Sequence, residues 1–349
     1  MRGLAACTLR TILYCLVIAL TVWSVAAIWI DGPRNRELAG MLAIVVAAGA
    51  LLLLLVVQPW WWSLATAVVP FVVVLAWWLS IAPSNERDWQ SDVARLPSAT
   101  IAGDRVTIRN VRNFAYPSAT TVVERWETRN YDLSRIDGFD MFLSSWGTKI
   151  IAHTISSWQF SDGQHLAISI ETRKKNGQDY APVLGFFRQY ELYYVVADER
   201  DVIGVRTGPR QETMQLYRVR GGPAFARALL LDYLDEVNRL AREPQWYNAL
   251  THNCTTRIRH HVQQVAAGNP FDWRILANGH LDELGYERRQ INTSLPFSEL
   301  RRRSDITARA RSAATSGDFS RVIREGLPER PEPVQGARPS ARTDSTGAR

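Results

Sequence analysis

The architecture of this chain follows first from an uncharged apolar stretch near its beginning, TILYCLVIALTVWSVAAIWI, from Thr11 to Ile30. A helix needs about 20 apolar residues to cross the hydrocarbon core of a membrane. Two further apolar stretches run from Met41 to Val57 and from Trp60 to Ala82, and a membrane helix tolerates the proline, Pro70, within the last of them. We therefore expect three transmembrane helices within residues 1–82.

The flanks of these stretches fit a membrane anchor. Trp60–Trp62 begin the third stretch, and Trp77 and Trp78 lie near its end, as in the aromatic belts of membrane interfaces. The first stretch is too long for a signal peptide and has no small-residue cleavage site, so we expect it to remain in the protein. Arginines flank both sides of the spans in nearly equal number, so charge alone does not set the orientation.

The chain has 349 residues and a formal net charge of +7. Its basic residues are scattered rather than gathered in a stripe, and almost all of them are arginines. A nucleic-acid-binding protein concentrates its basic residues on one face, so we expect no nucleic acid partner. A basic surface that faces anionic lipids remains consistent with this composition.

The part that follows the spans reads as a soluble α+β domain. A polar connector over residues 83–104 precedes seven short stretches with alternating β-branched and aromatic residues, which we predict to be strands: Arg105–Arg109, Thr120–Arg125, Lys149–Ile155, Gln164–Thr172, Tyr190–Val196, Val202–Arg206 and Met214–Val219. Helical periodicity follows over Ala224–Ala241 and from Asn253 to about Ala267. Strands that precede helices indicate an α+β domain over residues 105–270. A helical extension over 271–325 and a disordered tail over 326–349, rich in Pro, Arg, Ser and Gly, would complete the chain.

One segment of the soluble part has the features of a reactive site: WYNALTHNCTT, from Trp246 to Thr256. Asn253 is a good N-cap, which places Cys254 in the first turn of a helix. The N–H groups and the helix dipole there favour a thiolate and can hold an oxyanion. The other two cysteines, Cys7 and Cys15, lie at or inside the first span, so the soluble domain can form no internal disulfide. The alternative is that Cys254 is a small buried apolar side chain.

A thiolate nucleophile needs a base, and we consider His153 the best placed histidine. His252 lies in the loop before Cys254, and His260 and His261 lie two turns further along the same predicted helix. By the period of two, one face of the strand that follows His153 holds His165, Ala167, Ser169 and Glu171. Either His165 or Glu171 would orient the imidazole.

An alternative remains for these strand residues. His153 would be a core histidine with satisfied hydrogen bonds, and Glu171 would pair with Arg173 or Arg188. The acidic residues of Asp198-Glu199-Arg200-Asp201 could hold a cation, but we expect a solvated turn there. The sequence has no Gly-rich phosphate loop, no paired cysteines at metal spacing and no dinucleotide fingerprint, so we expect no obligatory metal or organic cofactor.

Several short motifs resemble, in kind and order, a bacterial family of uncharacterised domains named after the N-terminal periplasmic domain of Lnb, a lipoprotein N-acyltransferase. They are Val111-Arg112-Asn113-Phe114, Ala152-His153-Thr154, Ser169-Ile170-Glu171-Thr172-Arg173, Tyr190-Glu191-Leu192, Asp198-Glu199-Arg200-Asp201 and Asn253-Cys254-Thr255. The resemblance covers about Arg105 to Ala267. It implies a periplasmic domain, which fits three spans through the bacterial inner membrane with the N-terminus inside.

The order of the polar residues also resembles the circularly permuted branch of papain-like thiol enzymes, which includes lecithin:retinol acyltransferase. In that branch a strand histidine comes first, a polar residue on the next strand follows, and an Asn-Cys at a helix start comes last. The resemblance implies a papain-like domain with Cys254 as nucleophile, beside Asn253, and His153 as base. It makes His165 the orienting group, with Glu171 as the rival for that role.

These observations lead to three hypotheses. In the first, Cys254 takes an acyl group from a membrane phospholipid as a thioester and passes it to an acceptor such as a lipoprotein. In the second, the same site is a hydrolase that cuts an envelope peptide or amide, and a polar open groove rather than an apolar channel would favour it. In the third, the domain only binds an envelope partner, and Cys254 and His153 are not neighbours.

Overall fold

The computed structural model describes residues 2–118, 120–148, 150–266 and 270–332 of the chain. These residues form two compact units. The first holds the N-terminal residues up to Ser84 together with the segment Tyr180–Glu191, and the second holds the residues between and after them. Most of the tail predicted over 326–349 lies outside the described residues.

The N-terminal unit is built from apolar helices. They are α1 (Arg2–Asp31), α2 (Arg36–Val56), α3 (Trp60–Ala67) and α4 (Val69–Ser80). Three helical stretches are long and apolar enough to cross a membrane, as predicted: Leu4–Asp31, Arg36–Val56 and Trp60–Ser80. The third is interrupted at Val68 because Pro70 has no N–H group and its ring crowds the preceding turn.

The second unit contains a mixed sheet of eight strands, and the predicted α+β class is confirmed. The strands are β1 (Ser98–Ala102), β2 (Arg105–Arg112), β3 (Trp126–Asp132), β4 (Ile136–Ser145), β5 (Ala152–Phe160), β6 (His165–Arg173), β7 (Glu191–Ala197) and β8 (Thr213–Arg218). Their order is β1-β2-β7-β6-β5-β4-β8, and β3 pairs with β2. β2 and β7 are parallel, whereas β4, β5 and β6 form an antiparallel meander. This meander carries His153 and Glu171 on neighbouring strands.

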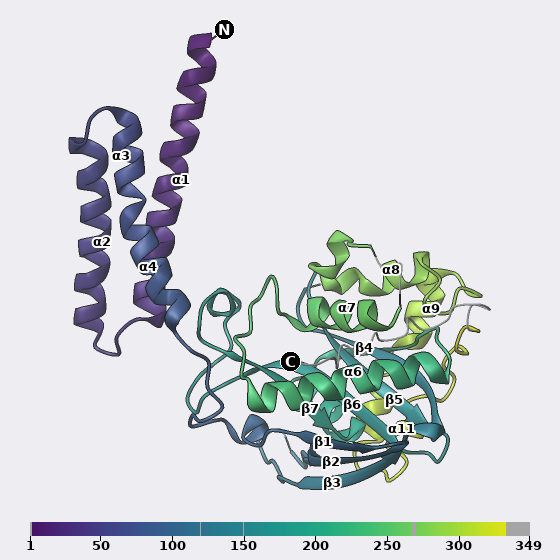
Figure 1. Ribbon diagram of the computed structural model, residues 1–349. Helices are drawn as coiled ribbons and strands as arrows, with labels where there is room; N and C mark the ends of the chain where they lie inside the picture. The colour runs from purple at the N-terminus through teal and green to yellow at the C-terminus, as the bar shows by residue number, and fades with distance from the viewer. Residues whose placement is uncertain (1, 119, 149, 267–269, 333–349) are drawn as a thin grey trace, which may run out of the picture. The chain divides into compact units, whose positions relative to one another are not determined.

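Helices cover both faces of the sheet. They are α5 (Glu199–Thr207), α6 (Pro223–Arg242), α7 (Cys254–Val265), α8 (Leu281–Glu287), α9 (Phe297–Ser304), α10 (Thr307–Ser312) and α11 (Phe319–Val322). Short 3-10 turns lie between these elements and the strands, namely η1 (Ser91–Val93), η2 (Leu133–Arg135), η3 (Pro182–Phe186), η4 (Trp273–Ile275) and η5 (Asn278–His280). Figure 1 shows α6 and α7 side by side over the sheet.

The side chains of β5 show which helices lie on which face. Trp158 points toward α6, where its indole N–H donates to the carbonyl oxygen of Ala226 at 2.8 Å. Ile155 belongs to a buried apolar core that includes Val202 of α5 and Phe319 of α11. Because successive side chains of a strand alternate in direction, α6 covers one face of the sheet, and α5 and α11 cover the other.

Two of the predicted strands are wrong. Val202–Arg206 lies within α5, because the Asp198 carboxylate accepts the N–H of Arg200 at 2.9 Å and caps the helix. Thr120–Arg125 contains only a bridge at Val123, and the strand β3 begins after it, at Trp126. The sequence patterns also missed β4, and β1 lies inside the predicted connector.

The predicted solvated turn at residues 198–201 is also wrong. Asp201 is fully buried and accepts two hydrogen bonds from the Arg112 guanidinium, both 2.9 Å long. Glu199 is buried as well and pairs with Arg324 at 2.6 Å. These two acidic residues therefore form buried ion pairs in the interior of the second unit.

Candidate active site

The first turn of α7 is fixed by its N-cap. The side-chain oxygen of Asn253 accepts the N–H of Thr256 at 2.9 Å, and the Thr256 hydroxyl accepts the N–H of Asn253 at 3.0 Å. This reciprocal capping box places Cys254 at the first helical position, as its sequence context predicted. The Cys254 side chain is buried there, with 8% of the residue exposed. Asn253 acts on the helix backbone rather than on the sulfur.

Cys254 and His153 influence each other's protonation. Burial by itself would raise the pKa of the Cys254 thiol, but the charge and hydrogen bond of His153 and the N–H of Thr154 lower it. Burial and the charge of Arg206 would lower the pKa of His153, but Glu171 and Cys254 raise it to about 9. Each group therefore favours the charged form of the other, a thiolate beside an imidazolium.

Two side chains on β6 hold the other side of the imidazole. His153 Nε2 lies 2.7 Å from the Ser169 hydroxyl oxygen and 3.2 Å from Glu171 Oε1. The Ser169 hydroxyl donates to the same carboxylate oxygen at 2.8 Å, so Nε2–H is the donor toward both groups. Nδ1 is then the ring nitrogen left for the sulfur. Ser169 and Glu171 share the strand face that the period of two predicted.

Arg206 on α5 forms an ion pair with Glu171. Its guanidinium donates to Glu171 Oε1 at 2.6 Å and to Glu212 Oε2 at 3.1 Å, and Glu212 also accepts the Ser144 hydroxyl. Burial alone would raise the pKa of Glu171, but His153 and Arg206 hold it well below its usual value. Arg206 was missed because its segment reads as a strand, although the Asp198 cap is visible in the sequence.

Asn278 on η5 is a second site residue that the sequence did not reveal. Its amide N–H donates to the Thr255 hydroxyl at 2.7 Å and lies 3.8 Å from the Cys254 sulfur. Its carbonyl oxygen accepts the N–H of Ala152, the residue before His153, at 2.8 Å. Asn278 thus ties the start of α7 to the start of β5 and leaves an amide donor beside the sulfur.

His165 lies away from this cluster. The pairing of Gln159 with His165 and of Ile155 with Ser169 puts His165 near the turn of the β5–β6 hairpin. Six residues separate it from Glu171, about 20 Å along a strand. Its Nδ1 lies 3.1 Å from the carbonyl oxygen of Gly163, and burial lowers its pKa. The structure brings Glu171, and not His165, to His153.

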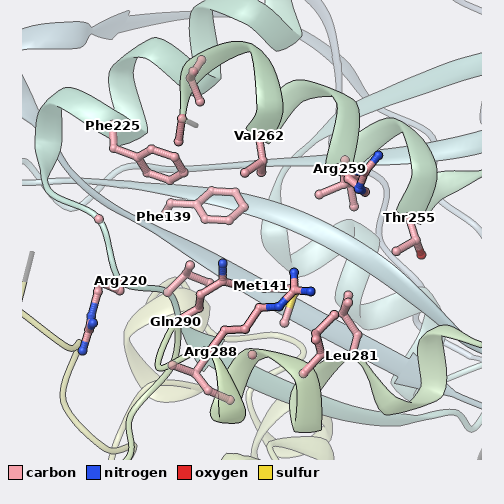
Figure 2. Close-up of a pocket in the computed structure, with 18 of the residues that line it drawn as sticks. Phe139, Met141, Arg220, Phe225, Thr255, Arg259, Val262, Leu281, Arg288 and Gln290 are labelled. Atoms are coloured by element: carbon pink, nitrogen blue, oxygen red, sulfur yellow. The ribbon is translucent and has the colours of Figure 1, made fainter. Parts of the chain in front are cut away.

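A mostly apolar cavity of about 510 Å³ is lined by Thr255, the residue that follows Cys254 on α7. The Thr255 hydroxyl lies 3.7 Å from the Cys254 sulfur. The same face of α7 continues the lining with Ile258 and Val262. Figure 2 shows Phe225 at one end of the cavity and Thr255 at the other. A volume of this size and an apolar lining suit a small-molecule or lipid ligand.

A cysteine at a helix start, a strand histidine that lowers its pKa and a carboxylate behind that histidine define a candidate thiol site on an α+β domain. The same chain carries three helices that are long and apolar enough to cross a membrane. Residues 123–279 match the family described as the Lnb N-terminal periplasmic domain, so the family named from the sequence is confirmed for this segment. The matched segment contains every residue of the site described above, from His153 on β5 to Asn278 on η5. No curated protein matches the chain, and no solved structure matches it either.

Proposed function

We propose that this protein is a thiol acyltransferase of the bacterial inner membrane, with its α+β domain in the periplasm. Cys254 would be the nucleophile, His153 the base and Glu171 the group that orients the imidazole. The observation that carries the proposal is the Cys254–His153–Glu171 cluster, whose cysteine directly precedes Thr255 in the lining of a mostly apolar cavity. The order of these residues along the chain also agrees with the permuted papain-like arrangement, which we include in the proposal.

The cavity favours an acyl chain over a peptide or a glycan. Each buried methylene of such a chain contributes about 0.8 kcal/mol, whereas polar substrates need a wall of hydrogen-bonding groups. Large apolar side chains near these residues in the chain are also exposed, among them Ile151, two residues before His153, Leu250, four residues before Cys254, and Trp273 on η4. A phospholipid ester would satisfy both features, with its acyl chain in the cavity and its carbonyl at the sulfur.

In the first half of the reaction, the Cys254 thiolate attacks the ester carbonyl carbon of the phospholipid. The N–H groups of the first turn of α7 and the amide of Asn278 lie beside the sulfur and would hold the oxyanion. When the ester C–O bond breaks, the leaving oxygen takes the proton of the His153 imidazolium. The products are a Cys254 thioester and a lysophospholipid.

In the second half, an acceptor amine attacks the thioester. His153, now neutral, takes the proton that the amine loses, and the C–S bond breaks to return the thiolate. The acceptor keeps the acyl group as an amide. The N-terminal amine of a lipoprotein fits this role because both it and the donor lie in the plane of the membrane.

The thioester itself is the test of this proposal. The full chain, with Cys7 and Cys15 replaced by alanine, is incubated in vesicles that contain a phospholipid with a labelled acyl chain and is then quenched in acid. We expect intact-mass spectrometry to find one acyl adduct that neutral hydroxylamine removes. The Cys254→Ala variant should carry none.

Two outcomes would speak against acyl transfer. A folded protein that never acquires the adduct, with several phospholipids tried as donors, would contradict the proposed chemistry. An adduct that releases free fatty acid at the same rate with and without an added lipopeptide amine would make the enzyme a hydrolase. The binding-module hypothesis predicts that Cys254 and His153 lie apart. The charge and hydrogen bond of His153 lower the pKa of the Cys254 thiol, which supports the enzyme instead.

A further inference from the structure

The connection between β6 and β7 belongs to the N-terminal unit rather than to the second unit, which holds the sheet. Residues Tyr180–Glu191 belong to the same compact unit as the N-terminal helices, although β6 before them and β7 after them are strands of the sheet. Within this segment, residues 182–186 form the short turn η3. Strand β6, which leads into the segment, carries Ser169 and Glu171, the two partners of His153.

Asp31, the last residue of α1, is the centre of the contact. Its carboxylate accepts the indole N–H of Trp78 at 2.7 Å and the backbone N–H of Arg188 at 3.0 Å. It also accepts the side-chain amide of Gln189 at 2.6 Å, and the Arg188 guanidinium lies 4.2 Å from the centre of the Trp78 ring. One carboxylate therefore joins α1, α4 and the β6–β7 connection.

An apolar contact fixes the depth of this segment along the helices. Phe187 is buried in a cluster with Ala27 and Ile28 of α1 and Val74 of α4. These residues lie within the last turns of α1 and the middle of α4, at the end of the spans where the tryptophans of the predicted interfacial belt are found. The segment thus lies level with the tryptophan-bearing end of the spans.

The side chains just before Phe187 are apolar and uncovered. Val183 is 64% exposed and Phe186 is 41% exposed, both on η3. Two large apolar side chains exposed on one short turn are a feature of surfaces that contact a membrane or a partner. Continuity with the transmembrane helices selects the membrane, because a bilayer that surrounds α1 and α4 reaches the level of Phe187.

We propose that η3 inserts Val183 and Phe186 into the interfacial layer of the bilayer and that Asp31 holds this connection at the end of the spans. The partner is the lipid itself, at the boundary between head groups and acyl chains, where amphipathic segments bind. The inference concerns membrane contact and does not depend on the chemistry of Cys254.

The test places an environment-sensitive fluorophore at single cysteines in the full chain. Val183→Cys and Phe186→Cys are made in a background that carries Cys7→Ala, Cys15→Ala and Cys254→Ser, and Ser161→Cys, at the exposed β5–β6 turn, is the matched control. Each labelled protein is placed, one copy per disc, in phospholipid nanodiscs with or without lipids that carry a quencher near the head group. We expect blue-shifted emission and strong quenching at positions 183 and 186, and neither effect at 161.

Each other outcome overturns part of the proposal. Emission at 183 and 186 that matches the control would mean that η3 faces water. Blue-shifted emission without quenching by the labelled lipid would mean that protein covers η3. Adding Asp31→Asn removes the shared acceptor and should weaken the quenching at 183, and quenching that stays unchanged would show that Asp31 does not hold the segment.

Discussion

At the scale of single residues, the charge state of the site depends on three groups acting together. Glu171 stays ionised because His153 and Arg206 hold its pKa low, and the ionised Glu171 helps to raise the pKa of His153 to about 9. The imidazolium in turn lowers the pKa of the Cys254 thiol. A change at any of the three groups therefore alters the reactivity of the sulfur.

The pH dependence of thiol alkylation tests this coupling. We expect Cys254 to react with iodoacetamide at neutral pH and the imidazolium beside it to be lost as the pH rises through about 9. His153→Ala removes the positive charge, which should raise the pKa of Cys254 and slow labelling at neutral pH roughly tenfold for each unit of the rise. Rates are measured in the Cys7→Ala, Cys15→Ala background. A His153→Ala profile equal to that of the parent would contradict the pairing.

A paired comparison separates the two candidate orienting residues. Glu171→Gln keeps the size of the side chain but removes the charge behind His153, so it should lower the pKa of His153 and reduce acyl-adduct formation. His165→Gln, about 20 Å along the strand, should leave adduct formation unchanged. Both variants are measured by the rate of adduct formation across pH. A larger loss with His165→Gln than with Glu171→Gln would reverse the assignment.

Only part of this site could be predicted from the sequence. Asn253-Cys254 and the face of Ser169 and Glu171 could be found because local patterns, an N-cap and a period of two, define them. Arg206 and Asn278 could not, because each reaches the site through tertiary packing from a segment that carries no motif of its own. The choice between His165 and Glu171 also needed the strand register, which the sequence does not show.

At the scale of elements, the first turn of α7 depends on its cap. Asn253→Ala removes the acceptor for the N–H of Thr256 and should cost about 1 kcal/mol of unfolding free energy. Asn253→Asp keeps an equally good cap, so its stability should match the parent, while its added negative charge should raise the pKa of Cys254 and slow alkylation. Denaturant unfolding of the full chain in detergent and the alkylation rate measure the two effects. Equal stability of the alanine and aspartate variants would exclude the capping role.

The elements that were hardest to predict are those whose polar residues are buried. Strand β4 contains Asp140 and Ser144, which break the apolar alternation and suggest a loop. In the structure Asp140 pairs with Arg324 at 2.9 Å and Ser144 donates to Glu212, so both are satisfied by distant segments. The prediction for the segment of α5 was wrong for the opposite reason. Its β-branched residues are typical of a strand, but the N-cap at Asp198 starts a helix.

At the scale of the whole molecule, the segment that follows the matched family region completes the core of the sheet domain. Ile306 caps the start of α10 and Ala310 lies within it, whereas Phe319 begins α11 and Ile323 follows its end. All four are buried in one apolar core with residues of the strands. The sequence predicted helices over 271–325 but gave no indication that they cover a face of the sheet. The domain therefore extends well past the end of the match at residue 279.

Arg324 is the polar centre of this C-terminal contact, and its removal should destabilise the whole domain. Its buried guanidinium donates to Glu199 at 2.6 and 2.8 Å and to Asp140 at 3.0 Å. Arg324→Gln would leave the buried Glu199 carboxylate without its cation and would leave Asp140 with Arg330 alone, at a cost of about 3–5 kcal/mol. Arg321→Gln, which removes two surface ion pairs one turn away, should cost at most about 1 kcal/mol.

The pH dependence distinguishes this mechanism from a simple loss of packing. Burial alone would raise the pKa of Glu199, but Arg324 holds it at about 2, so its contribution to stability is complete above its ordinary value of 4.5 and is lost only as the pH falls toward 2. In Arg324→Gln the unpaired carboxylate is relieved by protonation, so the gap between variant and parent should narrow as the pH is lowered from 7 toward 4. Denaturant unfolding at each pH measures that gap, and a gap that stays constant would show that the guanidinium contributes packing rather than charge.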